Sequence, residues 1–182
     1  MSEQNKDSFY EKQRMVRPKI EDVIGNLLNG DKLKNALAFI AYLRENKLTP
    51  QWTSGNSWKV SYKNYAVCYI RVCDGIHFNY NLEAGSWHIQ PFIGEYDANS
   101  LSDEFKEIVW ANKKRCCGGC SVRLNMIFGK VYNENACERS IVFDNPDVNE
   151  IECIKKLLEM RKSAIQEGKT KKHIYVAIKN RK

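Results

Sequence analysis

The residues best suited to chemistry lie at positions 116–120, which read Cys-Cys-Gly-Gly-Cys. Cys117 and Cys120 have two glycines between them, and two thiolates at this spacing can both reach one tetrahedral ion. The glycines let the backbone turn so that its amides face the sulfur atoms. Cys137 follows 17 positions after Cys120, a zinc-ribbon-like separation. The sequence therefore predicts a site for zinc or another soft metal, with Cys116, Cys117, Cys120 and Cys137 as ligands.

Three other interpretations of this cluster stay open. Because adjacent cysteines strain the backbone when both bind one ion, a site of three cysteines completed by His88, Cys73 or water is a variant. The thiols could instead be small packing residues in a tight, partly buried turn. Thiol redox chemistry is a third interpretation, because the basic residues 113–115 would favour thiolates. A thioredoxin-type enzyme is disfavoured, since the cysteine pair ends a predicted helix rather than opening one.

Of the remaining cysteines, Cys68 and Cys153 are predicted to have structural roles, and the pattern defines no role for Cys73. Cys68 and Cys73 are five positions apart in one predicted strand, so they point to opposite faces of the sheet and cannot serve one site. Cys68 and Cys153 are in or beside apolar patterns and are predicted to pack in the core. The seven cysteines are an odd number, and the chain shows no signal peptide or apolar run of membrane-spanning length. We therefore expect a cytoplasmic protein with reduced thiols and no membrane partner.

An aromatic-rich sheet region offers a second kind of site, a pocket for a small organic ligand. The polar residues expected around such a ligand are Tyr69, Arg71, His77, His88 and Glu95. The competing interpretation is that the aromatic residues form the core and a solvent-facing side of the sheet. No paired-histidine motif, nucleophile elbow or glycine-rich phosphate loop is present, so we assign no catalytic residue and expect a non-enzymatic protein.

The positive charge of the chain is concentrated at one end. The formal net charge is +7, but residues 169–182 hold six bases and no acid, which leaves 23 bases and 22 acids in the rest. A fold that grips a phosphate backbone needs a basic face with many contacts, so this distribution argues against a nucleic-acid partner. A solvated tail is the favoured interpretation, and nucleic-acid binding through the tail is the weaker alternative.

Hydrophobic periodicity predicts one α+β domain, with helices packed on one face of a largely antiparallel sheet. Residues 1–18 are expected to be a polar N-terminal arm, 19–168 the domain, and 169–182 a basic segment that could add an edge strand at 173–178. The pattern predicts helices over 20–28, 31–46, 102–115 and 147–168, and extended segments over 58–63, 65–73, 76–80, 86–93, 123–132 and 139–143.

Local signals refine the helices. Asp31 is predicted to cap the second helix, and Leu37 to belong to its apolar stripe. Pro146 is expected near the first position of the last helix, with Val148 on the buried face and Gly168 just beyond the end.

From about Leu27 to Ile165 the chain resembles a group of small uncharacterised bacterial proteins of the cytosol. The matching segments are Ser-Trp-Lys-Val-Ser-Tyr-Lys at 57–63, the cluster at 116–120, Ile-Phe-Gly-Lys at 127–130 with Cys137, and Asn-Pro-Asp at 145–147 leading to Cys-Ile-Lys-Lys-Leu at 153–157. The order of elements is more distantly similar to YdhG-like, frataxin-like domains of unknown function. The resemblance implies the fold more than any activity.

Overall fold

The computed structural model describes residues 11–75, 83–94, 98–114 and 123–169. The main sheet is antiparallel, with the strand order β1-β2-β3-β4-β7. Its strands are β1 (Thr49–Ser54), β2 (Ser57–Tyr62), β3 (Tyr65–Cys73), β4 (Ser86–Pro91) and β7 (Phe143–Asp144). A second sheet is the hairpin of β5 (Arg123–Ile127) and β6 (Lys130–Cys137). The predicted strand at 76–80 and edge strand at 173–178 lie outside the described residues.

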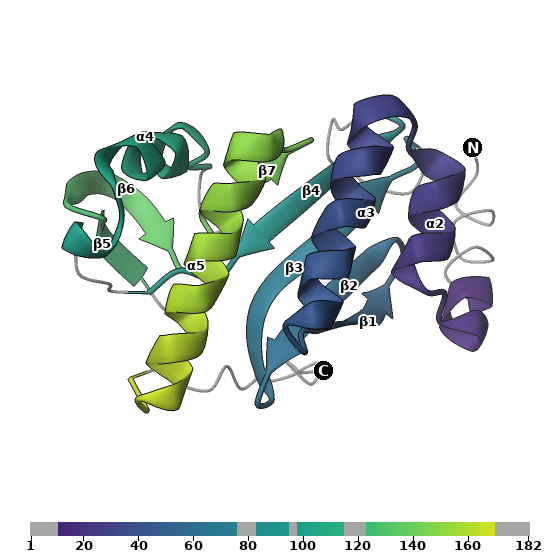
Figure 1. The fold of residues 1–182 in the computed structure, drawn as a ribbon, viewed down its shortest axis with the longest axis horizontal. Helices are drawn as coiled ribbons and strands as arrows, with labels where there is room; N and C mark the ends of the chain where they lie inside the picture. The colour runs from purple at the N-terminus through teal and green to yellow at the C-terminus, as the bar shows by residue number, and fades with distance from the viewer. Residues whose placement is uncertain (1–10, 76–82, 95–97, 115–122, 170–182) are drawn as a thin grey trace, which may run out of the picture.

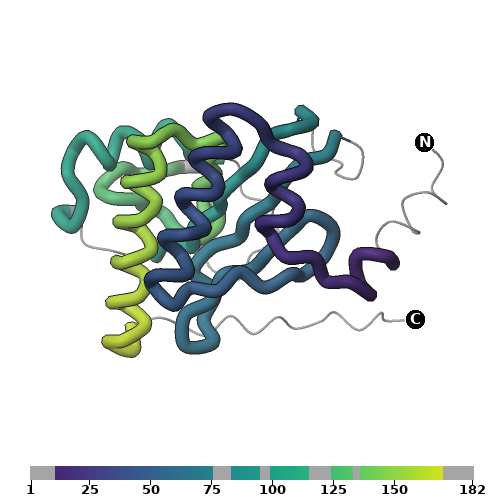
Figure 2. The backbone as a smooth tube through the Cα atoms, turned by 45° about the vertical axis from the view of Figure 1, so that its right-hand side comes forward, coloured from purple at the N-terminus to yellow at the C-terminus, as the bar shows by residue number. Residues whose placement is uncertain are grey.

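Helices cover one face of the main sheet, so the predicted α+β architecture is confirmed (Figure 1). The helices are α2 (Ile20–Leu27), α3 (Gly30–Glu45), α4 (Asp103–Ala111) and α5 (Val148–Gln166), with a short 3-10 turn at Ala98–Ser100. Figure 2 shows α3 and α5 running side by side across the strands. Phe39 of α3 packs near Trp87 of β4, with ring centroids 6.3 Å apart. None of the described helices is both long and apolar enough to cross a membrane.

From Cys68 to Cys73, alternation along β3 separates the two faces of the sheet. Cys68, Ile70 and Val72 are fully buried in the core, whereas Tyr69 and Arg71 point the other way. The ladder between β3 and β4 has no bulge from Cys68 to Cys73, so these two cysteines lie on opposite faces, as predicted. Cys153 of α5 is also fully buried in the core, which confirms its predicted packing role.

The start of α5 is fixed by a capping box rather than by proline. The Asp147 side chain accepts a hydrogen bond from the Glu150 backbone N–H, and the Glu150 side chain accepts one from the Asp147 backbone N–H. Pro146 therefore precedes the cap instead of occupying the first helical position. Val148 is 64% exposed, so its predicted place on the buried face is wrong. Gly168 follows the helix with a φ of 70°, the left-handed conformation expected at a helix end.

The second helix also differs in detail from the prediction. It begins at Gly30 with Asn29 as its N-cap, so Asp31 lies in the first turn and does not cap it. Its buried residues are Ala36, Phe39, Ile40 and Leu43, which follow helical spacing. Leu37 falls outside this stripe and is 42% exposed, so its predicted burial is wrong.

The segment predicted as one extended run over 123–132 is a hairpin. Phe128 and Gly129 both have positive φ, 46° and 86°, which is the pattern of a tight two-residue turn between antiparallel strands. The turn falls inside the Ile-Phe-Gly-Lys segment at 127–130, whose apolar residues suggested a continuous strand. The third predicted helix begins after Ser102, whose side chain accepts from Phe105 N–H, but it ends at Ala111 rather than near 115.

Part of the predicted N-terminal arm contacts the sheet. Residues 11–16 are helical, and the Gln13 side chain donates to Asn56 Oδ1 at 2.6 Å. The carbonyl of Pro18 accepts from the Trp58 indole N–H at 3.1 Å. These contacts place residues 13–18 against β1 and β2.

Candidate functional site

Three of the four predicted metal ligands, Cys116, Cys117 and Cys120, lie outside the described residues. The fourth, Cys137, is the last residue of β6 and is 1% exposed. Its backbone N–H donates to Ser140 Oγ at 2.8 Å, and the same hydroxyl lies 3.5 Å from Cys137 Sγ as a donor. Cys137 is therefore a buried thiol in a tight turn, with a hydroxyl directed at its sulfur.

The backbone on either side of the cysteine-containing segment is tied to the turn that carries Cys137. Arg123, which opens β5, is the register partner of Cys137. Lys114 donates its backbone N–H to the Ser140 carbonyl at 2.7 Å, and Lys113 forms an isolated bridge with Ile141. Both ends of the segment between 114 and 123 thus lie against residues 137–141.

The turn after Cys137 is itself held by the segment that follows β4 and by α5. The Ile93 backbone N–H donates to the Glu138 carbonyl at 2.9 Å. The buried Glu138 carboxylate lies 3.8 Å from the Arg161 guanidinium of α5. Burial raises the pKa of Glu138, and the charge of Arg161 opposes this shift. Cys137 is consequently placed by contacts to two separate elements.

Among the residues described in 11–75, 83–94, 98–114 and 123–169, no group of three or more His, Cys, Asp or Glu side chains is arranged to hold a metal ion. His88 and Cys73, the residues that could complete the predicted three-cysteine variant, both lie in the main sheet. Cys73 and His88 occupy adjacent strands there, and both ring nitrogens of His88 have protein partners.

Three of the predicted ligand-binding residues do share one face of the sheet. Arg71 of β3 is the register partner of His88 of β4, and Tyr69 is the partner of Gln90. Tyr69 lies over Phe92, with ring centroids 5.7 Å apart. His77 and Glu95, also predicted, lie outside the described residues. The residues brought together on this face are therefore Tyr69, Arg71 and His88.

The large tryptophans of the aromatic-rich region lie on the other face. Trp58 and Trp87 belong to the hydrophobic core and are 1% and 0% exposed. This agrees with the core interpretation for those two residues. The face carrying Arg71 and His88 is instead lined by polar side chains, since Ser57 and Arg71 are register partners on neighbouring strands.

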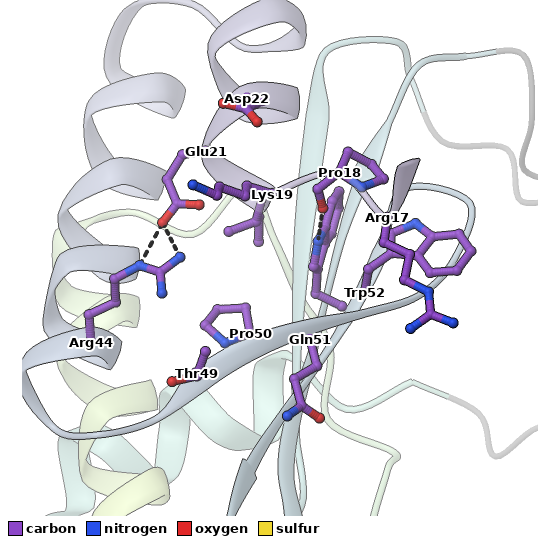
Figure 3. Close-up of a pocket in the computed structure, with 12 residues that line it drawn as sticks. Arg17, Pro18, Lys19, Glu21, Asp22, Arg44, Thr49, Pro50, Gln51 and Trp52 are labelled. Carbon is purple, nitrogen blue, oxygen red and sulfur yellow. Dashed lines mark hydrogen bonds and ion pairs between the residues drawn. The ribbon is translucent and has the colours of Figure 1, made fainter. Parts of the chain in front are cut away.

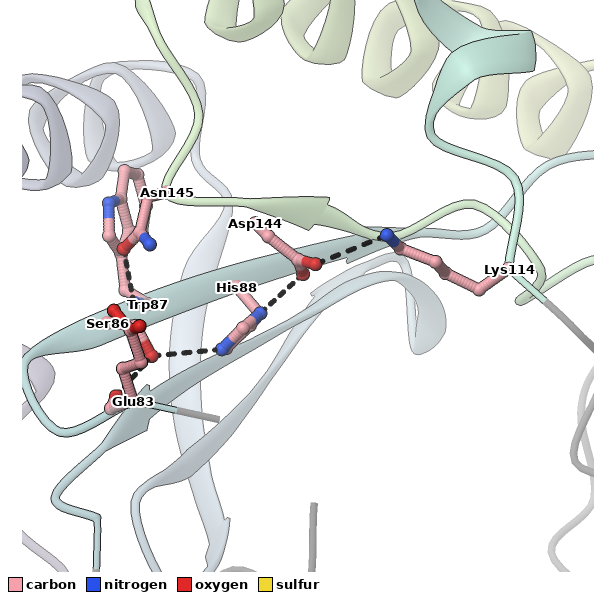
Figure 4. Close-up of polar contacts among 7 residues, drawn as sticks. All are labelled: Glu83, Ser86, Trp87, His88, Lys114, Asp144 and Asn145. Carbon is pink, nitrogen blue, oxygen red and sulfur yellow. Dashed lines mark hydrogen bonds and ion pairs between the residues drawn. The ribbon is translucent and has the colours of Figure 1, made fainter. Parts of the chain in front are cut away.

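His88 is the centre of a polar chain that crosses three elements (Figure 4). Its Nδ1 atom lies 2.6 Å from Asp144 Oδ1 of β7, and Lys114 Nζ lies 3.3 Å from the other oxygen of that carboxylate. On the opposite side of the ring, Nε2 lies 3.3 Å from Ser86 Oγ. His88 is 5% exposed, so its ring lies out of bulk water, whereas the Lys114–Asp144 pair is exposed.

The chain of contacts from Asp144 through His88 to Ser86 has the order of a hydrolase triad, but the Ser86 hydroxyl donates its proton to an acceptor other than His88. Ser86 Oγ donates to the Glu83 carbonyl at 2.7 Å, the shorter of its two contacts. The Ser86 oxygen is then left to act as an acceptor toward Nε2. This geometry orients an imidazole and does not activate Ser86 as a nucleophile.

Cys73 lies beside this chain, since it is the register partner of Ser86. Burial raises the pKa of the Cys73 thiol, and its interaction with the Ser86 hydroxyl only partly offsets that shift. A neutral thiol is a weak nucleophile and a weak metal ligand. Cys73 therefore adds a small, unreactive side chain to the polar face.

Sequence reasoning found His88 but missed Asp144, Ser86 and Lys114. Asp144 meets His88 because β7 pairs with β4, two strands more than 50 residues apart in the chain. The extended segment predicted over 139–143 stops one residue short of Asp144, and the two-residue strand β7 carries no pattern that shows its pairing with β4. The one available signal was the alternation of Ser86 and His88, which places both on one face.

In comparisons with protein-family models, curated proteins and solved structures, the chain has no match. The similarity to small bacterial proteins noted from the sequence therefore stays a prediction.

Proposed function

We propose that this protein is a non-catalytic, metal-binding protein in which the cysteines at 116–120, here called the cysteine loop, hold zinc or another soft ion together with Cys137. Cys117, Cys120 and Cys137 are the first three ligands, and Cys116 is the fourth. The observation that carries the proposal is the backbone register, which ties the residues before and after the cysteine loop to the turn beginning at Cys137.

The short stretches of chain between these cysteines and the described backbone support placing them at one site with Cys137. Cys120 is three residues from Arg123, and Cys116 is two residues from Lys114. A residue advances the chain by at most about 3.6 Å, so three residues reach about 11 Å. Each cysteine of the loop is thus within a few residues of backbone that is hydrogen-bonded to the Cys137 turn.

The surroundings of Cys137 suit a thiolate ligand. The Ser140 hydroxyl is directed at Sγ, and a hydrogen bond to a thiolate stabilises its charged form. Such outer contacts also orient a ligand on its metal.

A structural role for the ion follows from the fold. The β5–β6 hairpin forms its own two-stranded sheet, and an isolated hairpin is marginally stable in water. Its contacts to α4 include the Trp110 indole N–H, which donates to the Ile127 carbonyl at 2.8 Å. A metal bound at the base of the hairpin would fix its open end, where β6 finishes at Cys137.

The test is the metal content of protein purified without tags or added metal, together with titration of its reactive thiols. We expect one ion per chain, and fewer reactive thiols than in the same protein treated with a chelator. Cys120→Ser and Cys137→Ser should each lose the ion, whereas the matched control Cys73→Ser should retain it. A chain that holds no transition metal and exposes all its loop thiols would contradict the proposal.

The polar sheet face supports a second candidate, the binding of a small anionic molecule. The specific observation is that Arg71 and His88 are register partners, with Tyr69 at the next position on the same face. A ligand of this site would still raise the melting temperature when the loop cysteines are replaced by serine. Arg71→Gln would abolish that rise, while Lys34→Gln on the exposed side of α3 would leave it unchanged.

A further inference from the structure

One asparagine of the chain is placed so that it can react with its own backbone. Asn29 is exposed and lies between α2 and α3, and it is the one asparagine of the sequence that a glycine follows. It is the N-cap residue of α3 and has extended backbone, with a φ of −141° and a ψ of 171°. An Asn-Gly pair in contact with water therefore stands just outside the regular helix.

The Asn29 side chain is not held by the helix that it precedes. An N-cap asparagine usually accepts a hydrogen bond from a backbone N–H of the first turn, but Asn29 accepts none from the described first turn of α3. Its backbone carbonyl accepts from the Leu33 N–H at 3.2 Å, whereas the matching bond at the start of α5, from Ile151 to Asp147, is 2.9 Å long. The Asn29 amide is thus not restrained by a cap.

Gly30 leaves the approach to this amide open. Apart from its chain neighbours and the backbone of α3, no atom of the described residues lies within 4 Å of the place a Cβ would take. The first N–H groups of a helix have no acceptor within the helix, so the Gly30 nitrogen is not needed to hold α3 together. A side chain on residue 30 would hinder this nitrogen as it turns back toward Asn29, and glycine has none.

We propose that Asn29 is a site of spontaneous deamidation. The Gly30 nitrogen, once it has lost its proton to hydroxide, bonds to Cγ of Asn29, and the bond from Cγ to Nδ2 breaks. The departing nitrogen takes a proton from water and leaves as ammonia, which regenerates hydroxide and leaves a succinimide ring between residues 29 and 30. Water then adds to one ring carbonyl and breaks its bond to the ring nitrogen. The product is an aspartate or an isoaspartate at position 29.

The two products have opposite effects on the start of α3. An aspartate is among the best N-cap residues, and its negative charge is favourable at the N-terminus of a helix. An isoaspartate instead carries the main chain through its Cβ and Cγ atoms. This lengthens the chain and takes the carbonyl that accepts from Leu33 out of the helix backbone. The isoaspartate product should therefore unwind the first turn of α3.

The first turns of α3 also hold two other segments of the chain. Lys32 Nζ donates to the Gly85 carbonyl, just before β4, at 3.3 Å. Asn35 Nδ2 donates to the Pro146 carbonyl, just before the cap of α5, at 3.2 Å. An isoaspartate at position 29 should weaken both contacts and lower the melting temperature of the protein, whereas an aspartate should preserve them.

The loosening should stay local, because α2 and α3 are joined again at their other ends. Figure 3 shows Arg44, near the end of α3, paired with Glu21 in the first turn of α2, with Arg44 Nε 2.7 Å from the carboxylate. Leu28, the neighbour of Asn29, is buried in the core. The isoaspartate form should therefore stay folded and be available for measurement.

The test follows each asparagine by peptide mapping and mass spectrometry while the full chain is incubated at mildly alkaline pH. Asn64 is the matched control, because it is also exposed but is followed by tyrosine. Asn29 should convert at least about tenfold faster than Asn64, since glycine has no Cβ to hinder ring closure. Its rate in the folded chain should also lie within about tenfold of its rate in the urea-unfolded chain. Equal rates at the two asparagines, or stronger protection of Asn29 by the fold, would overturn the proposal.

Two variants separate the reaction from the stability of the helix. Gly30→Asp adds a Cβ for which there is room, at a φ of 54° that aspartate tolerates better than most residues, so conversion of Asn29 should slow at least about tenfold in a folded chain. Asn29→Asp reproduces one product and should melt no lower than the natural chain. The purified isoaspartate form should melt lower than both. Unchanged conversion in Gly30→Asp would reject the reaction through Gly30, and an isoaspartate form that melts like Asn29→Asp would reject its effect on α3.

Discussion

Individual side chains show where the sequence was informative. The opposite orientation of Cys68 and Cys73 follows from their spacing in one strand, because alternation needs only local backbone geometry. The partners of His88 could not be predicted in this way. Asp144 reaches it through a strand pairing between distant parts of the chain, and Lys114 reaches Asp144 from the residues that follow α4.

The Asp144 carboxylate is expected to stabilise the fold through two partners. Asp144→Asn keeps an acceptor for His88 but removes the negative charge, so we expect the free energy of unfolding to fall by about 1 kcal/mol. The value is modest because Asp144 is 39% exposed and solvent screens its charge. Urea denaturation at neutral pH measures the change. Lys114→Met is the control for the exposed pair alone, and an equal loss in both variants would contradict a specific role for His88.

The buried Cys153 thiol predicts a loss of stability at alkaline pH. Burial raises its pKa from the ordinary value of 9.0 to about 12. The unfolded chain therefore releases this proton first as the pH rises, so the neutral thiol stabilises the fold fully below about pH 9 and progressively less above it. Urea denaturation at about pH 8 and about pH 10.5 measures this decline.

Cys153→Ala is the matched comparison for this alkaline decline. The variant should be less stable than the natural chain at about pH 8, because it loses buried contacts, but its stability should fall less on going to about pH 10.5. An equally steep decline in the two proteins would mean that the Cys153 thiol does not titrate as its burial indicates.

At the scale of elements, turns and helix caps determine where helices and strands begin and end, which hydrophobic periodicity does not define. The hairpin between β2 and β3 was predicted because Lys63 and Asn64 separate two alternating runs, and both residues have positive φ. The β5–β6 hairpin was missed because Phe128 occupies a position that usually holds asparagine, aspartate or glycine. The start of α5 was predicted to within one residue from Asn145, Pro146 and Asp147, although the structure fixes it with the Asp147–Glu150 capping box and not with proline.

The Lys63–Asn64 turn offers a stabilising substitution. Asn64 has a φ of 67°, which glycine adopts without steric cost. Asn64→Gly should raise the free energy of unfolding by about 0.5 kcal/mol, and Asn64→Ala should lower it, because alanine is strained in this conformation. Thermal denaturation of the two variants checks the sign of each effect. Equal stability of the glycine and alanine variants would contradict the positive φ.

At the scale of the whole molecule, the two-layer architecture was predictable and the site was only partly so. Helical and strand periodicities report which face of each element is buried, and that information is enough to specify helices on one side of a sheet. Long-range pairings are not encoded in local patterns. The pairing of Arg123 with Cys137 and the bond from Lys114 to Ser140 became visible only in the folded chain.

Those two backbone contacts lead to the central claim, that the cysteine loop and Cys137 hold one soft metal ion. Titration of the metal-free chain with Co²⁺, followed by optical absorption, tests it most directly because thiolate ligation and tetrahedral geometry both have spectral signatures. The account predicts a thiolate-to-cobalt charge-transfer band and intense visible bands that saturate at one ion per chain. Zinc should displace the cobalt, and Cys137→Ser should weaken the charge-transfer band while Cys73→Ser retains it. A titration that yields only the pale spectrum of hydrated cobalt, with the fold intact, would contradict the account.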